Sequence, residues 1–285
     1  MKRFLLLTSL LATAVYCQPP YLSSQEAFAV YATEFYGKKL PGTRVTKLQN
    51  FSLSFQLPNK EPAILFLDNP FLACKSAPSD CETTLLKYLP SPDSADLKGD
   101  RLSIRPMLKS KEYASQLQSM FNSGPKKQKA PTTPFIGDIT ILYAFDFPER
   151  MAVVDEEDMR AVGASDVESL HRLALLNMEA RTGELAYKEI QPESGIYALT
   201  YEDSLAPSRV LLQDKWAAVA RKIKGNPILA IPSREFVLFV AEGDAARVRS
   251  LRELVRKVFS GEDHAVSMQL MHWTPRGWEL YSDEQ

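Results

Sequence analysis

Hydrophobic and polar residues alternate in the first third of the chain in a pattern that predicts an antiparallel sheet. Across residues 51–57, phenylalanine and leucine side chains alternate with serine and glutamine, as expected of a strand with one buried face. Shorter apolar runs at 44–48 and 63–67 predict two neighbouring strands. Further strands are predicted at 101–107, 138–145, 150–154, 185–190, 196–201, 228–231, 236–240, 265–273 and 278–281.

Apolar residues spaced three and four apart predict helices among these strands. Phe28, Tyr31 and Phe35 form the stripe of a first helix, and Ser23 with Glu26 has the spacing of a capping box at its start. Further helices are predicted at 81–89, 109–121, 165–180, 204–223 and 244–258, with Asp80, Ser165 together with Glu168, Ser204 and Asp244 at their starts.

The order of these elements predicts the fold class. Helices and strands are interspersed without the regular strand–helix alternation of a doubly wound sheet. We therefore expect an α+β fold with mixed, largely antiparallel sheets and packed helices, in one or two subdomains. Residues 122–134 lack periodicity and are rich in proline, lysine, serine and threonine, which predicts an exposed linker or loop between subdomains at 18–121 and 135–285.

The first 17 residues have the pattern of a signal peptide. Lys2 and Arg3 precede a short apolar run, and small residues follow at positions that predict cleavage after Ala14 or Cys17. The run is shorter than the roughly 20 residues that span a bilayer. The alternative is a buried N-terminal helix. Tyr16 is too large for the position before a lipidated cysteine, so we expect a periplasmic or secreted protein.

Cleavage after Cys17 would leave two cysteines, Cys74 and Cys81, in an oxidising compartment. Their proximity predicts a local disulfide. The alternative, a redox pair, is disfavoured because the spacing is not that of a Cys-x-x-Cys motif.

Composition and charge narrow the possible partners. The chain is 45% hydrophobic and 10% aromatic, enough to bury a core. Without Lys2 and Arg3, 32 basic residues face 35 acidic ones, so the mature net charge is −3. A mildly acidic surface predicts no affinity for nucleic acid, and no later stretch predicts a membrane span. Arg249, Arg252 and Arg256 form a basic stripe that fits a solvated face or an acidic protein partner.

Motifs for catalysis or cofactor binding are absent from the sequence. No dinucleotide, phosphate-loop, zinc-protease or nucleophile-elbow pattern occurs. The histidines His171, His264 and His272 have no ligand spacing, so no metal and no cofactor are expected.

Four residues are weak catalytic candidates. Asp146 and Glu149 follow a hydrophobic strand, where carboxylates can serve catalysis or form a turn. Arg234 could bind an anion or pair with a buried carboxylate such as Asp203 or Asp146. His171, on an apolar helix flank, fits the edge of a core better than a catalytic base.

Five segments of the chain carry a resemblance to a known family, namely residues 101–110, 137–146, 162–170, 175–178 and 231–236. In these segments the chain resembles the YtpQ-like family of uncharacterised bacterial proteins. The resemblance implies a bacterial α+β protein of unknown function and contributes no catalytic residues. The signal-like segment and the Cys74/Cys81 pair depart from the plainer members of that family.

These observations predict a non-catalytic interaction or accessory protein whose partner is another envelope or secreted protein. Two alternatives stay open at this point. One is a hydrolase that uses Asp146 and Glu149 with Arg234 as an anion clamp, which would require these residues and His171 to converge in one pocket. The other is a protein that binds a small ligand in an apolar cavity.

Overall fold

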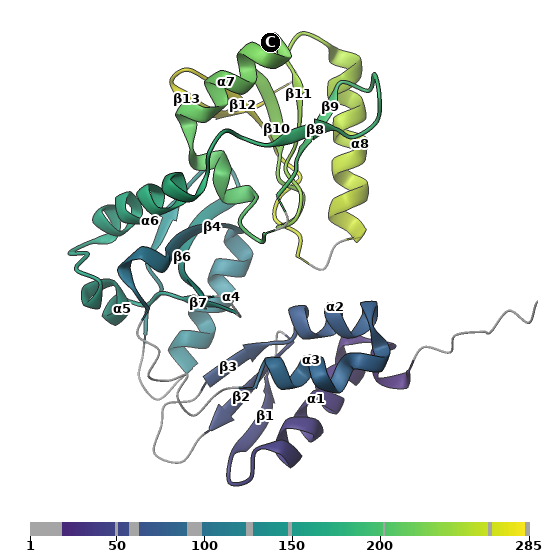
Figure 1. Cartoon of the computed structure of the whole chain (residues 1–285), viewed down its shortest axis with the longest axis vertical. Coiled ribbons are helices and arrows are strands. Elements are labelled where there is room, and N and C mark those ends of the chain that lie inside the picture. Colours follow the sequence, from purple (N-terminus) through teal and green to yellow (C-terminus); the bar gives the residue numbers. More distant parts are fainter. Residues whose placement is uncertain are drawn as a thin grey trace, which may run out of the picture. The chain divides into compact units, whose positions relative to one another are not determined.

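The computed structural model describes residues 19–48, 51–56, 63–89, 99–123, 128–147, 150–201, 203–261 and 264–282 (Figure 1). The predicted signal peptide at 1–17 lies outside these residues. The chain divides into two compact units, Met1–Pro92 and Asp93–Gln285. Within the described parts of the chain, no helix is both long and apolar enough to cross a membrane.

In its described residues, the first unit combines a three-stranded antiparallel sheet with three α-helices. The sheet order is β1-β2-β3, and every predicted strand of this region is present. The element bounds are α1 (Gln25–Lys39), β1 (Arg44–Leu48), β2 (Ser52–Gln56), β3 (Ala63–Phe66), α2 (Asp68–Ser76) and α3 (Cys81–Lys87). Leu53 and Phe55 of β2 face a core that includes Phe28 and Tyr36 of α1 and Leu85 of α3. The buried Tyr36 hydroxyl donates to the carbonyl of Leu85 (2.9 Å).

Two predicted helix caps of this unit are wrong. Ser24, not Ser23, caps α1, because its Oγ accepts a hydrogen bond from Ala27 N–H (3.1 Å), while the Ser23 hydroxyl donates to Pro20 O in the preceding turn. Asp80 makes no side-chain cap at α3. Helix α2 was not predicted, because its nine residues include a proline and show no clear stripe.

The predicted disulfide is confirmed. Cys74 near the end of α2 is bonded to Cys81 at the start of α3, with their Cα atoms 4.6 Å apart. Both cysteines are buried in the core of the first unit. The disulfide therefore holds two short helices against that core.

The second unit contains two antiparallel sheets, which confirms the α+β class. One has the order β4-β6-β5, with β7 also paired to β6, and the other has the order β13-β12-β10-β11-β9-β8. The first sheet consists of β4 (Ile104–Ser110), β5 (Thr132–Pro134), β6 (Ile139–Phe147) and β7 (Arg150–Val153). The second consists of β8 (Tyr187–Glu189), β9 (Ile196–Leu199), β10 (Pro227–Ala230), β11 (Leu238–Ala241), β12 (Leu270–Thr274) and β13 (Gly277–Leu280).

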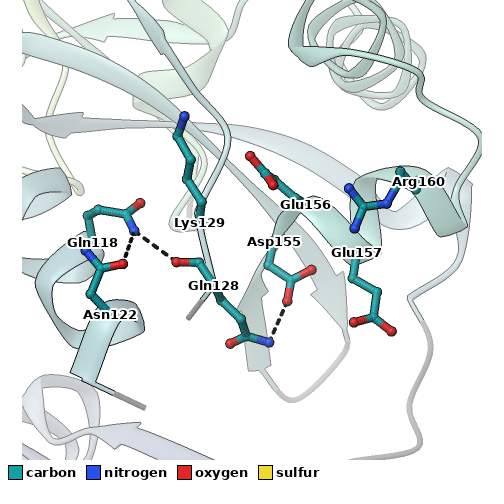
Figure 2. Close-up of a pocket in the computed structure, with 8 residues that line it drawn as sticks. All are labelled: Gln118, Asn122, Gln128, Lys129, Asp155, Glu156, Glu157 and Arg160. Carbon is teal, nitrogen blue, oxygen red and sulfur yellow. Dashed lines mark hydrogen bonds between the residues drawn. The ribbon is translucent and has the colours of Figure 1, made fainter. Parts of the chain in front are cut away.

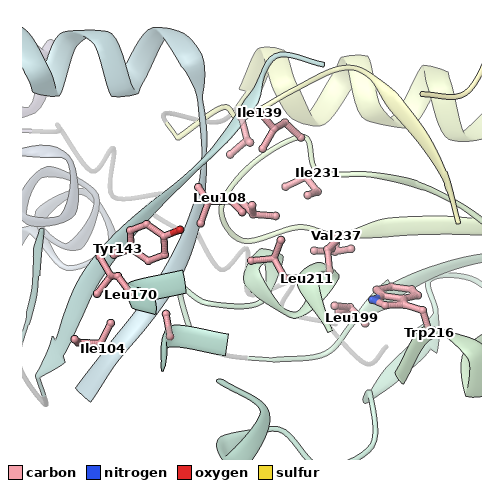
Figure 3. Close-up of a cluster of buried hydrophobic side chains, with 14 of the residues drawn as sticks. Ile104, Leu108, Ile139, Tyr143, Leu170, Leu199, Leu211, Trp216, Ile231 and Val237 are labelled. Atoms are coloured by element: carbon pink, nitrogen blue, oxygen red, sulfur yellow. The ribbon is translucent and has the colours of Figure 1, made fainter. Parts of the chain in front are cut away.

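Within the described residues of the second unit, five α-helices accompany these sheets. They are α4 (Lys111–Ser123), α5 (Glu156–Ala161), α6 (Val167–Arg181), α7 (Gln213–Ile223) and α8 (Ala245–Gly261). Side chains from both sheets and from α6 and α7 share one apolar core, part of which Figure 3 shows. Ile139, Ile141 and Tyr143 reach this core because alternate residues of a strand face the same side. Trp216 of α7 is buried there, and its ring lies 5.4 Å from that of Phe239.

The predicted subdomain boundary differs from the division that the structure shows. Residues 101–121 belong to the second unit, because β4 pairs with β6 from Ile104↔Phe145 to Ser110↔Ile139. The end of the predicted linker at 122–134 forms β5, which also pairs with β6. Composition alone could not reveal this boundary, since the pairing joins segments on either side of the apparent linker.

Helix starts in the second unit were predicted with mixed success. Asp244 caps α8 as predicted, accepting from the N–H groups of Ala246 (3.0 Å) and Arg247 (3.1 Å). The predicted Ser165/Glu168 box is wrong, because Asp166 caps α6 in a capping box with Ser169. The helix predicted from Ser204 is a 3-10 turn at Pro207–Leu211 followed by α7.

Loss of the disulfide should destabilise the first unit selectively. Replacing both cysteines by serine, or reducing them, should lower its free energy of unfolding by about 2.5 kcal/mol, because a loop of this length regains entropy in the unfolded chain. Hydrogen exchange of the first unit in urea measures this. All three tryptophans, Trp216, Trp273 and Trp278, lie in the second unit, so their fluorescence transition is an internal control. Equal exchange in the oxidised and reduced proteins would contradict the prediction.

Candidate functional site

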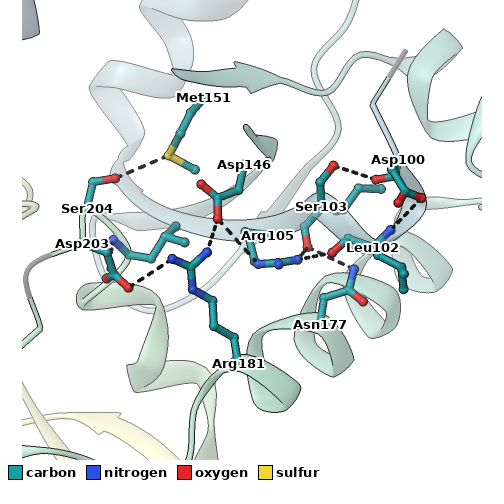
Figure 4. A network of polar contacts seen from close by, with 12 residues as sticks. Asp100, Leu102, Ser103, Arg105, Asp146, Met151, Asn177, Arg181, Asp203 and Ser204 are labelled. Atoms are coloured by element: carbon teal, nitrogen blue, oxygen red, sulfur yellow. Dashed lines mark hydrogen bonds and ion pairs between the residues drawn. The ribbon is translucent and has the colours of Figure 1, made fainter. Parts of the chain in front are cut away.

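Asp146, a predicted candidate, belongs to a row of alternating charges at one end of β6 (Figure 4). Its carboxylate binds Arg181 of α6 and lies 3.9 Å from Arg105 Nε of β4. Arg181 also lies 3.9 Å from Asp203, which binds Arg209 through two hydrogen bonds of 2.7 Å. We call these five residues the arginine–aspartate chain.

Arg209 is the most buried member of the arginine–aspartate chain. Its side chain is 2% exposed and its guanidinium lies 3.6 Å from the centre of the Tyr201 ring. Burial opposes ionisation of Asp203, but the hydrogen bonds and charge of Arg209 outweigh it and hold the pKa of Asp203 below its usual value. Asp203 therefore stays a carboxylate, which satisfies a charge that would be costly to bury alone.

The arginine–aspartate chain is better suited to fastening elements together than to catalysis. Guanidinium groups are always charged, so they cannot relay protons, and carboxylates bound to them are weak bases. Ser204, which follows Asp203 in the sequence, donates its hydroxyl to Met151 Sδ (3.5 Å). Nearby, the Asn177 amide of α6 donates to the carbonyls of Arg101 (2.8 Å) and Ile104 (3.2 Å). These contacts connect β4, β6 and α6 with the turn that contains Arg209.

His171 of α6 contacts β6 on the face opposite to that of Asp146. Its Nδ1 lies 3.0 Å from the hydroxyl of Tyr143, which also bonds to Thr133 Oγ1 (2.6 Å). Residues 143 and 146 are three apart on β6, so their side chains face opposite sides of the sheet. Burial lowers the pKa of His171 and raises the pKa of Tyr143 to about 12. His171 is therefore neutral at pH 7 and does not share a pocket with Asp146.

Arg234 occupies a third location, in the segment between β10 and β11. It pairs with its neighbour Glu235, so the predicted pairing with Asp203 or Asp146 is wrong. Its backbone N–H donates to the carbonyl of His264 (3.1 Å), a neighbour that sequence reasoning missed. Burial, with the charges of Arg234 and Lys109, lowers the pKa of His264 to about 3. Glu149, the fourth candidate, lies outside the described residues.

A separate polar groove of about 420 Å³ lies between α4 and α5 (Figure 2). Its lining consists of Gln118, Asn122, Gln128, Lys129, Asp155, Glu156, Glu157 and Arg160. The volume falls within the roughly 300–1,000 Å³ of small-ligand sites, but such sites are mainly apolar. Here, Gln118 donates to Gln128 O (3.0 Å), and Gln128 donates to Asp155 (2.8 Å). These groups bind one another, and the described part of the chain contains no cluster of potential metal ligands.

Sequence reasoning did not identify the arginines of the arginine–aspartate chain. Arg105, Arg181 and Arg209 lie on a strand, a helix end and a turn that are far apart in the sequence. An arginine in the last turn of a helix is also common for local reasons, because it interacts favourably with the helix dipole. No local signal therefore distinguishes these three residues from solvated arginines.

Comparison of the chain with protein-family models, with curated proteins and with solved structures finds no match. The fold and the contacts above define an antiparallel α+β protein of two units. The resemblance to the YtpQ-like family stays a prediction that rests on the segments quoted for it.

Removal of the charge on Asp203 should destabilise the second unit strongly. In Asp203→Asn the guanidinium of Arg209 stays buried without its counterion, which should cost about 3–5 kcal/mol. Urea unfolding followed by tryptophan fluorescence measures the change. Asp214→Asn, an exposed position on α7 with the same change of charge, should shift stability by no more than about 0.5 kcal/mol. Equal effects of the two substitutions would contradict the structural role of the arginine–aspartate chain.

Mild acid should also weaken the second unit, through His264. A histidine whose pKa is lower in the folded than in the unfolded protein binds fewer protons when folded. The contribution of neutral His264 to the free energy of unfolding is complete above about pH 6.5 and is lost as the pH falls toward 3. We expect the loss of this contribution to lower the free energy of unfolding by about 1–2 kcal/mol when the pH falls from 7.5 to 5.

Urea unfolding at several pH values tests the role of His264, with His264→Gln as the matched variant. The variant should lose this part of the pH dependence, while the smaller contribution of His171, whose pKa is also lowered, should remain. A variant with the same pH profile as the wild-type protein would show that His264 titrates normally.

Proposed function

We propose that this chain is an exported protein that acts by binding another envelope or secreted protein and not by catalysis. The observation that carries the proposal is the separation of Asp146, His171 and Arg234. Each is engaged in its own contacts, with Arg181, Tyr143 and Glu235 respectively. A hydrolytic site would require such groups to converge on one concave surface.

The proposed location, the periplasm or the exterior of the cell, rests on two features. Residues 1–17 have the composition of a signal peptide. Cys74 and Cys81 are bonded to each other, and disulfides persist mainly in oxidising compartments. Together, these features favour export to a compartment where the available partners are envelope or secreted proteins.

The hydrolase alternative has weaker support. Asp146, its proposed acid or base, is held between Arg181 and Arg105, and the arrangement of Glu149 is outside the described residues. A small-ligand protein would use the groove between α4 and α5, whose size is suitable but where Gln118, Gln128 and Asp155 already bind one another.

Gentle affinity purification from the envelope fraction of the native host, followed by mass spectrometry, tests the proposal. We expect a stoichiometric protein partner, together with a mature N-terminus after residue 14 or 17 and an oxidised Cys74–Cys81 pair. The tag alone, exported by the same signal, is the matched control. Recovery of a partner-free chain that retains Met1 would overturn both parts of the proposal.

A further inference from the structure

The edge strand β8 and helix α7 border a small apolar pocket. Its volume is about 150 Å³, below the roughly 300 Å³ at which clefts begin to enclose whole small molecules, so it suits a single side chain. Its lining consists of Gly183, Glu184, Leu185, Tyr187, Lys215, Ala218, Val219 and Lys222. The Tyr187 wall is held in place, because its ring packs against those of Tyr197 (5.8 Å) and Phe239 (5.4 Å).

Beside this pocket, the backbone of β8 has an open edge. β8 is the last strand of the six-stranded sheet, and among the described strands it pairs only with β9. Ala186 O accepts from Thr200 N (3.0 Å), and Ile190 N donates to Ile196 O (2.9 Å). The backbone N–H and C=O groups of the even-numbered residues in this segment therefore point toward β9. In an antiparallel ladder the alternate residues, Tyr187 and Glu189, then direct their N–H and C=O groups outward. These groups can pair with an added strand.

Charges around the pocket favour an acidic occupant. Lys215 is half-buried, and within the described residues its ammonium makes no ion pair. Lys222 pairs with Glu184 at 3.0 Å, but both side chains are largely exposed, so this pair is weak. Two lysines and one glutamate leave a net charge of +1, which a carboxylate near Lys215 would neutralise.

We propose that the open edge of β8 and the adjacent apolar pocket bind an extended segment of a partner protein, which adds to β8 as a further strand. The segment places one apolar side chain in the pocket and a carboxylate near Lys215. Main-chain pairing of this kind provides affinity, while the pocket selects the side chain. The inference rests on the proposed function and names the surface and the partner chemistry that would serve it.

A second copy of the chain is a poorer occupant of the same edge in the registers centred on Lys188 and Glu189. Self-pairing of β8 about a twofold axis at Lys188 sets two lysines directly opposite each other, and an axis at Glu189 does the same for two glutamates. Like charges directly opposite in a sheet are destabilising, and a lysine on an edge strand is a common obstacle to self-pairing. A different protein avoids this repulsion.

Selection from a phage-displayed library of random decapeptides on the oxidised full-length chain tests the proposal. We expect enriched peptides that share an apolar residue close to aspartate or glutamate. Fluorescence anisotropy of the most enriched peptide should show binding at least about tenfold weaker for Ala218→Leu, which fills the pocket, and for Lys215→Glu, which reverses its charge. Arg221→Glu, with the same charge change on α7 but outside the pocket, should change the Kd less than about twofold.

Three outcomes would overturn the proposal. They are no enriched motif, a peptide whose Kd is unchanged in both pocket variants, and a dimer of the chain that Ala218→Leu disrupts in the absence of peptide. Purification with Ala218→Leu separates this proposal from the proposed function. If the variant still recovers the native partner, the chain binds that partner elsewhere, whereas a wild-type chain without any partner would refute the proposed function itself.

Discussion

The pairing of β4 with β6 is the contact on which the second unit depends. It joins residues 104–110 to 139–145 in continuous antiparallel register and places β6 between β4 on one side and β5 and β7 on the other. With its hydrogen bonds satisfied on both sides, β6 can bury nearly all of its side chains. Ile139, Ile141 and Tyr143 then reach the core shared with the six-stranded sheet. The same register sets Arg105 beside Asp146, where the arginine–aspartate chain begins.

The arginine–aspartate chain uses five charged residues of the second unit to hold elements together. Once Arg209 is buried against Tyr201, it requires the carboxylate of Asp203, because an unpaired charge in that position would be very costly. Arg181 then connects Asp203 with Asp146, so a helix, a strand and a turn are joined by alternating charges. A carboxylate that is paired with a guanidinium is a weaker base than a free one. By contrast, the outer edge of β8 pairs with no other described strand, which is why we look for recognition at the edge of a sheet.

The two units reach stability by different means. The second unit buries a large apolar core in which Trp216 contacts rings from two strands of the six-stranded sheet. The first unit is smaller, and small domains bury a smaller fraction of their surface. Its disulfide offsets part of that deficit by holding α2 and α3 together, with both sulfurs inside the core. Tyr36 adds a specific contact across that core through its bond to Leu85.

The sequence by itself determined the fold class, most of the strands, the cap at Asp244 and the Cys74–Cys81 bond. Each of these depends on periodicity or spacing within a few residues, because a strand exposes alternate faces and a short loop keeps its ends close. Neighbouring alternatives at a helix start, such as Ser23 and Ser24, differ only in backbone geometry, so the caps were often displaced by one residue. Only the tertiary structure decided the unit boundary, the partners of Asp146, His171 and Arg234, and which strand lies at an edge. These depend on which distant segments pair and in which register, and a local pattern of residue types does not contain that information.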